Sequence, residues 1–274
     1  MHGTRNLFRA LLVGLGLVLG GATAAHAACT RVIQVPVSAM GQSVRIEGDT
    51  ITGIYPDLLR GLSDKEGCTF VLTEVPRARQ EIMFETGRAD LLIPASKTPK
   101  RDALGTFVAL IHNRATLLSI QSNRAAVKTV RDLQDNSKLK VALVRGFDYG
   151  PIYQELITAL GKQGRLILEV DAVSVARLLK AGTADVTIMA PTILVGAVQG
   201  DERVQDILDK LRTEPLDDLP WGDSGVYIST TALNPQDKAA LQDALERVAR
   251  SGEVWKGFLR YYSPSILKDS IRPL

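Results

Sequence analysis

The segment 94–101 brings two hydroxyl groups and a guanidinium together, those of Ser96, Thr98 and Arg101. It directly follows the apolar run 89–93, so these side chains are expected where a buried strand ends and a loop begins, which is where open α/β sheets bind ligands. A guanidinium binds a carboxylate through two parallel hydrogen bonds, and nearby hydroxyls add shorter ones. The segment therefore predicts a carboxylate-binding site; the alternative is that these side chains are simply solvated.

Histidine limits the other chemistry that the chain can support. His2 and His26 lie in an N-terminal segment that we expect to be removed, which leaves His112 as the one imidazole of the mature protein. A serine–histidine–aspartate triad could use only this histidine, and a histidine-rich zinc site is excluded. We expect no catalytic residues, no bound metal and no cofactor.

The N-terminus has the features of a secretory signal peptide. Arg5 and Arg9 precede the uncharged run 10–25, and small residues flank His26 in a cleavage pattern. We expect cleavage after Ala27 and a mature protein in the periplasm. The alternative, a retained membrane anchor, is disfavoured because glycines interrupt the apolar run.

The charge of the mature chain argues against a nucleic-acid partner. The whole chain has 33 basic and 30 acidic residues, a formal net charge of +3. Residues 1–27 contain two of the basic residues and no acidic one, so the mature chain has 31 minus 30, or +1. Nucleic-acid binding requires a basic field, which this chain lacks, and we identify no aromatic stacking platform.

Cys29 and Cys68 are expected to form a disulfide. Two cysteines of an exported protein usually pair, because export leads to an oxidising compartment. Each cysteine precedes a strand-like run, at 31–37 and at 69–75. Adjacent parallel strands would bring the two cysteines together at one edge of a sheet.

Strands and helices are predicted to alternate along most of the chain. The first half contains strand 31–37, a helix from Gly53, strand 69–75, helix 77–84 and strand 89–93. The second half contains strand 140–144, helix 151–160, strand 166–170, a helix capped by Ser174 through Lys180, and strand 185–189. A polar helix around 204–211, strand 226–229 and helices 235–250 and 253–262 follow. This order predicts α/β architecture with mostly parallel sheets flanked by helices.

The two halves also resemble each other in sequence. The segment 85–95 matches 180–190, with Gly-x-Ala-Asp in each, and 53–59 is echoed by 150–157. We therefore predict two lobes of similar design.

The lobes are expected to be connected by two chain crossings. We assign 28–116 and 223–274 to lobe 1 and 117–222 to lobe 2, because the run 115–121 can lead out of lobe 1 and the turn-rich segment 214–225 can return to it. Two crossings make a hinge, and a hinge creates a cleft that can close on a ligand.

Four segments carry a resemblance to a known family. The most specific is 87–101, where Gly-Arg-Ala-Asp is followed by Ser-Lys-Thr-Pro-Lys-Arg, and 53–59, 180–185 and 225–229 are further similar segments. Through them the chain resembles the family 3, polar amino-acid type, extracellular solute-binding proteins of ABC importers, over essentially the whole mature chain. The resemblance implies a two-lobe periplasmic binding protein type II (Venus flytrap) fold, in which Arg101 binds the α-carboxylate of the ligand with Ser96 beside it.

Other positions depart from the pattern of that family. Met40 lies in the loop where the family often has an aromatic residue, and Ala190 stands where it usually has an acidic residue for the α-ammonium. Phe147 and Asp148 could instead cover the ligand and accept an ammonium. Arg77 and Arg79 follow strand 69–75, where either could be a second anion contact or a cation at the helix start. The expected ligand-binding residues are Met40, Arg77, Arg79, Ser96, Thr98, Arg101, Phe147 and Asp148.

We therefore expect a protein that captures a small carboxylate-bearing ligand, an amino acid or a related organic anion, and delivers it to an ABC importer. Its expected partners are that ligand and, transiently, a membrane ABC permease; we expect no nucleic acid and a monomer. Two alternatives stay open. One is a dehydratase-like periplasmic enzyme on the same scaffold, with Asp148, Asp223 or Glu74 as acid or base. The other is a protein that presents its ligand to a membrane sensor.

Overall fold

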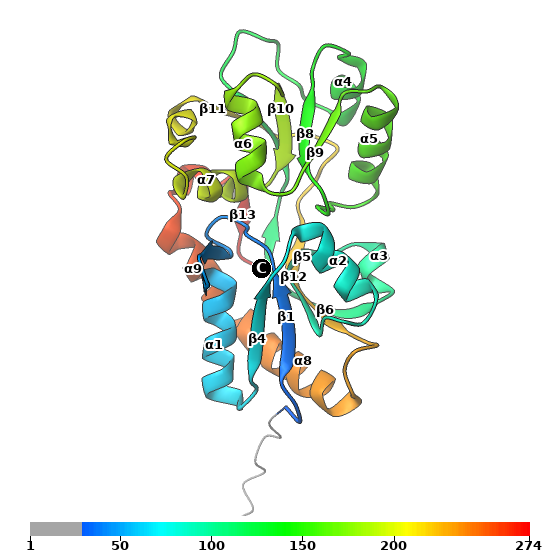
Figure 1. The fold of residues 1–274 in the computed structure, drawn as a ribbon, viewed down its shortest axis with the longest axis vertical. Coiled ribbons are helices and arrows are strands. Elements are labelled where there is room, and N and C mark those ends of the chain that lie inside the picture. Colours follow the sequence, from blue (N-terminus) through cyan, green and yellow to red (C-terminus); the bar gives the residue numbers. More distant parts are fainter. Residues whose placement is uncertain (1–28) are drawn as a thin grey trace, which may run out of the picture.

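The protein is an α/β molecule of two lobes, one above the other along its long axis (Figure 1). The computed structural model describes residues 29–274, so the predicted signal peptide, 1–27, lies outside the described residues. Within 29–274 no helix has both the length and the apolar character that a membrane crossing requires.

Lobe 1, the lower lobe in Figure 1, combines the first and the last parts of the described chain. Its elements are β1 (Ile33–Val37), β2 (Arg45–Glu47), β3 (Thr50–Thr52), α1 (Ile54–Glu66), β4 (Phe70–Glu74), α2 (Arg77–Glu85), β5 (Leu91–Ser96), α3 (Pro99–Asp102), β6 (Gly105–Asn113), β12 (Gly222–Ser229), α8 (Pro235–Ser251), α9 (Glu253–Tyr261), α10 (Pro264–Leu267) and β13 (Ile271–Arg272). Strands β1 and β4 pair in parallel, as predicted.

The other sheet of lobe 1 differs from the prediction. Its four strands lie in the order β13-β6-β12-β5, and all of their pairings are antiparallel. The sequence did not indicate β6, which pairs along its length with the returning strand β12. Because β12 lies between β5 and β6 and runs against both, the mostly parallel sheet expected for lobe 1 is limited to its N-terminal strands.

Lobe 2 contains the middle of the chain. Its elements are β7 (Thr116–Ile120), α4 (Val130–Asp135), β8 (Val141–Val144), α5 (Pro151–Lys162), β9 (Leu166–Glu169), α6 (Ala172–Lys180), β10 (Val186–Met189), α7 (Pro191–Gln199), the 3-10 helix η1 (Gln205–Lys210) and β11 (Leu211–Glu214). The sheet order is β11-β7-β10-β8-β9, with β10, β8 and β9 parallel and the two crossing strands antiparallel. The polar helix expected around 204–211 is thus a 3-10 helix that ends at Lys210.

The helix α6 begins earlier than the sequence indicated. Its N-cap is Asp171, whose carboxylate accepts a hydrogen bond from the Ser174 backbone N–H at 2.7 Å. The predicted cap, Ser174, is therefore the third helical residue. An aspartate cap satisfies a backbone N–H that has no partner within the helix and also places a negative charge at the positive helix end.

The repeated Gly-x-Ala-Asp segment has the same structural role in both lobes. The Asp90 carboxylate accepts a hydrogen bond at 2.7 Å from the backbone N–H of Gln34 in β1. The Asp185 carboxylate accepts one at 2.7 Å from the N–H of Lys140, just before β8. Each aspartate thus fixes the start of its own strand beside a neighbouring strand, which explains why the two halves share this motif.

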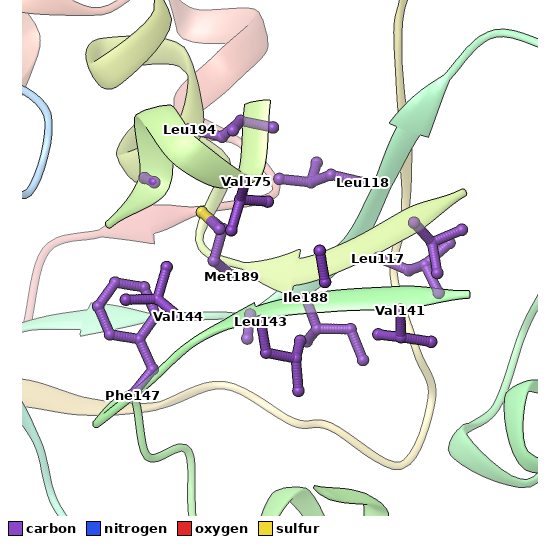
Figure 2. Packing of buried hydrophobic residues seen from close by; sticks show 14 of the residues in the cluster. Leu117, Leu118, Val141, Leu143, Val144, Phe147, Val175, Ile188, Met189 and Leu194 are labelled. Carbon is purple, nitrogen blue, oxygen red and sulfur yellow. The ribbon is translucent and has the colours of Figure 1, made fainter. Parts of the chain in front are cut away.

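The buried cluster of lobe 2 surrounds β7, β8 and β10 and extends to the end of the sheet that faces lobe 1. Figure 2 shows Phe147 beyond the end of β8, next to Val144, as part of this cluster. Phe147 is 5% exposed, so the loop that carries it is fixed to the lobe-2 core.

Two segments connect the lobes, 114–115 and 215–221. Arg114 in the first crossing donates hydrogen bonds to the carbonyl oxygens of Leu216 and Leu219 in the second, at 3.1 and 3.2 Å. The two crossings are therefore joined to each other by side-chain hydrogen bonds.

The predicted disulfide is present between Cys29 and Cys68, at the start of the parallel strands β1 and β4. It closes a loop with a sequence separation of 39. For a loop of this length, loss of the disulfide is expected to lower the free energy of unfolding by about 3–4 kcal/mol, because the unfolded chain regains entropy. Urea unfolding of the oxidised and the reduced protein, each followed by circular dichroism, measures the difference; equal midpoints would contradict it.

Candidate ligand-binding site

A cavity of about 40 Å³ lies between the lobes and is lined by residues of both. Lobe 1 contributes the end of β5, the first residue of α2 and Tyr55 of α1, and lobe 2 contributes the loop after β8 and the start of α7. Six of the eight residues proposed from the sequence line it: Met40, Arg77, Ser96, Arg101, Phe147 and Asp148.

Arg101 is positioned by the short helix α3. Thr98 is the N-cap of this helix, and its hydroxyl accepts a hydrogen bond from the Arg101 backbone N–H at 3.4 Å. The Arg101 side chain is 3% exposed. Its Nη1 donates to the Ser96 carbonyl oxygen at 2.8 Å, and its Nη2 and Nε donate to the two carboxylate oxygens of Glu81 at 2.8 and 3.2 Å. The guanidinium is thus fixed at the edge of the cavity.

Arg77 is a second buried arginine on the same wall. Its Nη1 donates to the Pro94 carbonyl oxygen and to Gln80 Oε1, both at 3.0 Å, and its Nη2 donates to Glu81 Oε1 at 2.6 Å. Burial lowers the pKa of Arg77 below its usual value, and the Glu81 carboxylate opposes this effect. The Nε of Arg77 is buried without a hydrogen-bond partner among residues 29–274.

The two arginines share a single carboxylate, that of Glu81. Two guanidinium groups and one carboxylate leave this buried cluster with one positive charge that is not compensated within it. A buried charge without a partner is costly, so the cluster favours binding of a negatively charged group in the cavity.

The lobe-2 wall of the cavity contains two aromatic residues. Phe147 and Tyr149 lie edge to face, with ring centroids 6.2 Å apart. The Tyr149 hydroxyl accepts a hydrogen bond from the Ala190 N–H at 3.4 Å, and burial raises the pKa of Tyr149 to about 12. Asp148 adds the one carboxylate that lines the cavity within residues 29–274, and its Oδ1 accepts a hydrogen bond from the Gly150 N–H at 2.9 Å.

Glycines allow the lobes to meet closely on both sides of the cavity. A Cβ atom on Gly146 of lobe 2 would lie 2.9 Å from the Ala78 backbone in α2 of lobe 1. On the other side, a Cβ atom on Gly196 of α7 would lie 2.8 Å from the Cα of Gly41 in lobe 1. Both contacts are interlobe contacts, so the structure shows the cleft closed.

Solved structures of other proteins have this architecture. A histidine kinase sensor domain with similarity to periplasmic binding proteins has a TM-score of 0.67 and 18% identity, with 85% of this chain and 96% of that chain covered. The substrate-binding protein of an amino acid ABC transporter has a TM-score of 0.64 and 16% identity, with 85% and 99% covered. The chain has the two-lobe fold of periplasmic binding proteins.

A third neighbour with this periplasmic binding fold is an ancestral amino acid-binding protein described as a precursor of cyclohexadienyl dehydratase. It has a TM-score of 0.64 and 16% identity, with 85% of this chain and 96% of that chain covered. No family model matches the sequence. No curated protein sequence matches it either.

Two residues expected at the ligand lie outside the cavity of this binding fold. Arg79 is exposed on the far side of α2. The Thr98 side chain is buried under α3, where its cap holds the helix that carries Arg101, and it does not line the cavity. Thr98 therefore affects the site indirectly, because its cap fixes the backbone position of Arg101.

Sequence reasoning also missed two residues of the site, Glu81 and Tyr55. Glu81 lies four residues after Arg77 on α2, and that i,i+4 spacing was the available signal for an ion pair. Its contact with Arg101 depends on the tertiary arrangement of α2 and α3. Tyr55 is the second residue of α1, where helical periodicity alone indicates a core residue.

Proposed function

We propose that the protein is a periplasmic solute-binding protein that captures a small carboxylate-bearing ligand, an amino acid or a related organic anion, in the cleft between its lobes. In this proposal it acts as a monomer and delivers the ligand to an ABC permease in the membrane. Residues 1–27 act as the cleaved signal peptide that directs it to the periplasm.

The observation that carries the proposal is the net positive charge within the Arg77–Glu81–Arg101 cluster at the wall of an interlobe cavity. Each terminal nitrogen of Arg101 makes one hydrogen bond within the described chain and has a second hydrogen available to a ligand. A bound carboxylate would compensate the cluster and accept these bonds. Since the cavity is lined from both lobes, closure around the ligand adds contacts and removes water.

Arg101→Met is expected to weaken binding of the carboxylate ligand by about 10- to 100-fold, because a charged hydrogen bond contributes about 1.5–3 kcal/mol. The fold should tolerate this change, since Arg77 and Glu81 remain as a neutral pair. A thermal-shift screen of amino acids and organic acids against the wild-type protein identifies the ligand, and titration calorimetry then compares the two proteins.

The matched control for this experiment is Arg79→Met, which removes an exposed arginine outside the cavity and should leave affinity unchanged. No ligand in the screen, or equal affinity of wild type and Arg101→Met for the ligand found, would refute carboxylate capture by Arg101.

A second candidate function is presentation of the ligand to a membrane sensor. It is supported by the structural likeness to a histidine kinase sensor domain. Capture and presentation use the same cleft, so the two functions differ only in the membrane partner. Pull-down of detergent-solubilised permease or sensor kinase by the ligand-loaded protein separates them.

An enzyme on this scaffold is a third candidate, supported by the likeness to a precursor of cyclohexadienyl dehydratase. Of the carboxylates named from the sequence, Asp148 lines the cavity, Asp223 contacts His112 at 2.9 Å and Glu74 is exposed at the end of β4. An acid or base must reach the ligand. Conversion of the bound ligand to a new product, lost in Asp148→Asn, would favour the enzyme.

A further inference from the structure

The last segment of the chain, residues 262–272, lies beside helix α7 at the junction of the lobes (red in Figure 1), and its helix α10 packs against α7. The segment belongs to lobe 1, since β13 pairs with β6 and Tyr262 is part of the buried cluster of that lobe. Helix α7 belongs to lobe 2, because Ile193, Leu194 and Val198 are part of the lobe-2 cluster. Contacts between the segment and α7 therefore cross from one lobe to the other.

The first turn of α7 is capped from outside the helix. Its N-cap is Ala190, which has no polar side chain, and Pro191 at the first helical position has no N–H. The Ile193 N–H donates to the Ala190 carbonyl oxygen at 2.9 Å. The Thr192 N–H donates to the Ser270 hydroxyl at 3.1 Å, and the hydroxyls of these two residues are 3.0 Å apart. Ser270 thus supplies from lobe 1 the oxygen that an N-cap residue ordinarily supplies within its own helix.

Tyr262 holds the other side of Thr192. Its hydroxyl donates to the Thr192 carbonyl oxygen at 2.7 Å. Burial raises the pKa of Tyr262, so the hydroxyl keeps its proton and its role as a donor at neutral pH. Thr192 is 1% exposed, Tyr262 5% and Ser270 0%. Because a buried polar group that loses its partner is costly, these bonds stabilise the arrangement in which the lobes meet.

The same segment also contacts both of the segments that connect the lobes. The Ser270 carbonyl oxygen accepts a hydrogen bond from the Arg114 N–H, in the first of them, at 2.9 Å. The Arg272 guanidinium lies over the ring of Trp221, in the second, at 4.6 Å from its centroid, which is a cation–π contact. Residues 270–272 are thus in contact with both lobes and with both connecting segments.

The residues held by this segment line the ligand cavity, whereas the residues that hold them do not. Thr192 and Ile193 line the cavity, and so does Ile271, which follows Ser270. Ser270 and Tyr262 are not among the lining residues. Both therefore act on a bound ligand through the position of α7 and the contact between the lobes.

Building on the proposed function, we propose that Ser270 and Tyr262 are positioning residues of the ligand site. They hold the first turn of α7 against lobe 1 and so stabilise the closed cleft over the open one without touching the ligand. Residues 262–272 are then a third connection between the lobes, which forms when the cleft closes and breaks when it opens.

Ser270→Ala and Tyr262→Phe each remove only a hydroxyl group. In the ligand-free protein each is expected to shift the equilibrium about three- to tenfold towards the open cleft, because hydrogen bonds of the closed form are lost. Amide hydrogen exchange followed by NMR should then be faster at Thr192 by about the same factor. In Tyr262→Phe the Ser270 acceptor of this N–H is intact, so faster exchange there reports opening. Small-angle scattering should show a larger radius of gyration for both variants.

Two matched controls lie in or beside the same segment. Ser265→Ala removes an exposed hydroxyl that contacts the Ser263 hydroxyl, and Tyr261→Phe removes the hydroxyl of a tyrosine that is 38% exposed. Both should leave the exchange at Thr192 and the radius of gyration unchanged. The amides of the buried strand β8 should exchange at the wild-type rate in all four variants, which shows that lobe 2 itself stays intact.

The outcomes separate this inference from the proposed function. Unchanged Thr192 exchange in Tyr262→Phe, or faster exchange with an unchanged radius in both variants, would overturn the role of these residues in closure. Each acid that binds in the thermal-shift screen should bind both variants about three- to tenfold more weakly, by the same factor for every acid, because the closed form is less populated. A loss that differs between acids would indicate direct contact and overturn the positioning role. If both variants open the cleft but no amino acid or organic acid binds the wild type, the proposed function fails and the connection between the lobes stands.

Discussion

Gly196→Ala is expected to hold the lobes apart and to weaken ligand binding by about 5- to 100-fold. A Cβ atom at this position would lie 2.5 Å from Tyr262 Oη, 2.7 Å from the Gln42 backbone nitrogen and 2.8 Å from the Gly41 Cα. Two of these are backbone atoms, so they cannot rotate away. Overpacking of this kind costs about 1–3 kcal/mol. Here the clash can be relieved if the two lobes move apart at this contact.

The contact that Gly196 permits joins helix α7 of lobe 2 to lobe 1. The Tyr262 hydroxyl donates to the Thr192 carbonyl oxygen at 2.7 Å and accepts from the Gln42 N–H at 3.1 Å. Val195 on the same helix is part of the buried cluster of lobe 1. The Tyr262–Thr192 hydrogen bond and the packing of Val195 cross between the lobes, so a methyl group at Gly196 acts on this interlobe contact.

The substitution should not harm lobe 2 itself. Gly196 lies inside α7, and its φ is not positive, so alanine is favoured there by up to about 1 kcal/mol. Gly61→Ala is the matched control, because Gly61 lies in helix α1 and a Cβ atom there meets nothing within 4 Å. Small-angle scattering should show a larger radius of gyration for Gly196→Ala alone, and titration calorimetry the weaker binding. An unchanged radius together with wild-type affinity would show that the interlobe contact does not control closure.

The fold was predictable where local sequence determines it. Asp90 and Asp185 each tie a strand to a neighbouring strand within one short motif, so the motif was visible as a repeat. The parallel pairing of β1 and β4 followed from the positions of the two cysteines. Strand β6 was not recognised from the sequence. It is stabilised by its pairing with β12, which lies more than a hundred residues later in the chain.

The site was predictable only in part because side-chain direction depends on where a helix begins. Arg77 and Arg79 are two residues apart on α2 and so project about 200° apart. Only one of them can face the cavity, and the start of the helix at Arg77 decides which. The close approach at Gly196 and the shared carboxylate of Glu81 depend on contacts between separate elements, which sequence spacing does not encode.

Glu81→Gln is expected to lower the free energy of unfolding of the ligand-free protein by about 3–5 kcal/mol. The change keeps the shape of the side chain but removes the one carboxylate shared by Arg77 and Arg101, which are 4% and 3% exposed. Loss of one partner from a buried ion pair leaves an uncompensated buried charge, and here it leaves two. Urea unfolding at constant low salt measures the loss; guanidinium chloride is unsuitable because its chloride would supply an anion.

The control on the same helix is Glu85→Gln. Glu85 contacts Lys100 at 2.5 Å, but their side chains are 33% and 67% exposed, so its loss should change stability by less than about 1 kcal/mol. The carboxylate ligand should then raise the stability of Glu81→Gln by more than that of wild type, because a bound anion replaces part of the missing charge. If Glu81→Gln were as stable as Glu85→Gln and gained no more from the ligand, the two arginines would be compensated by groups other than Glu81, and the positive charge on which carboxylate capture depends would be absent.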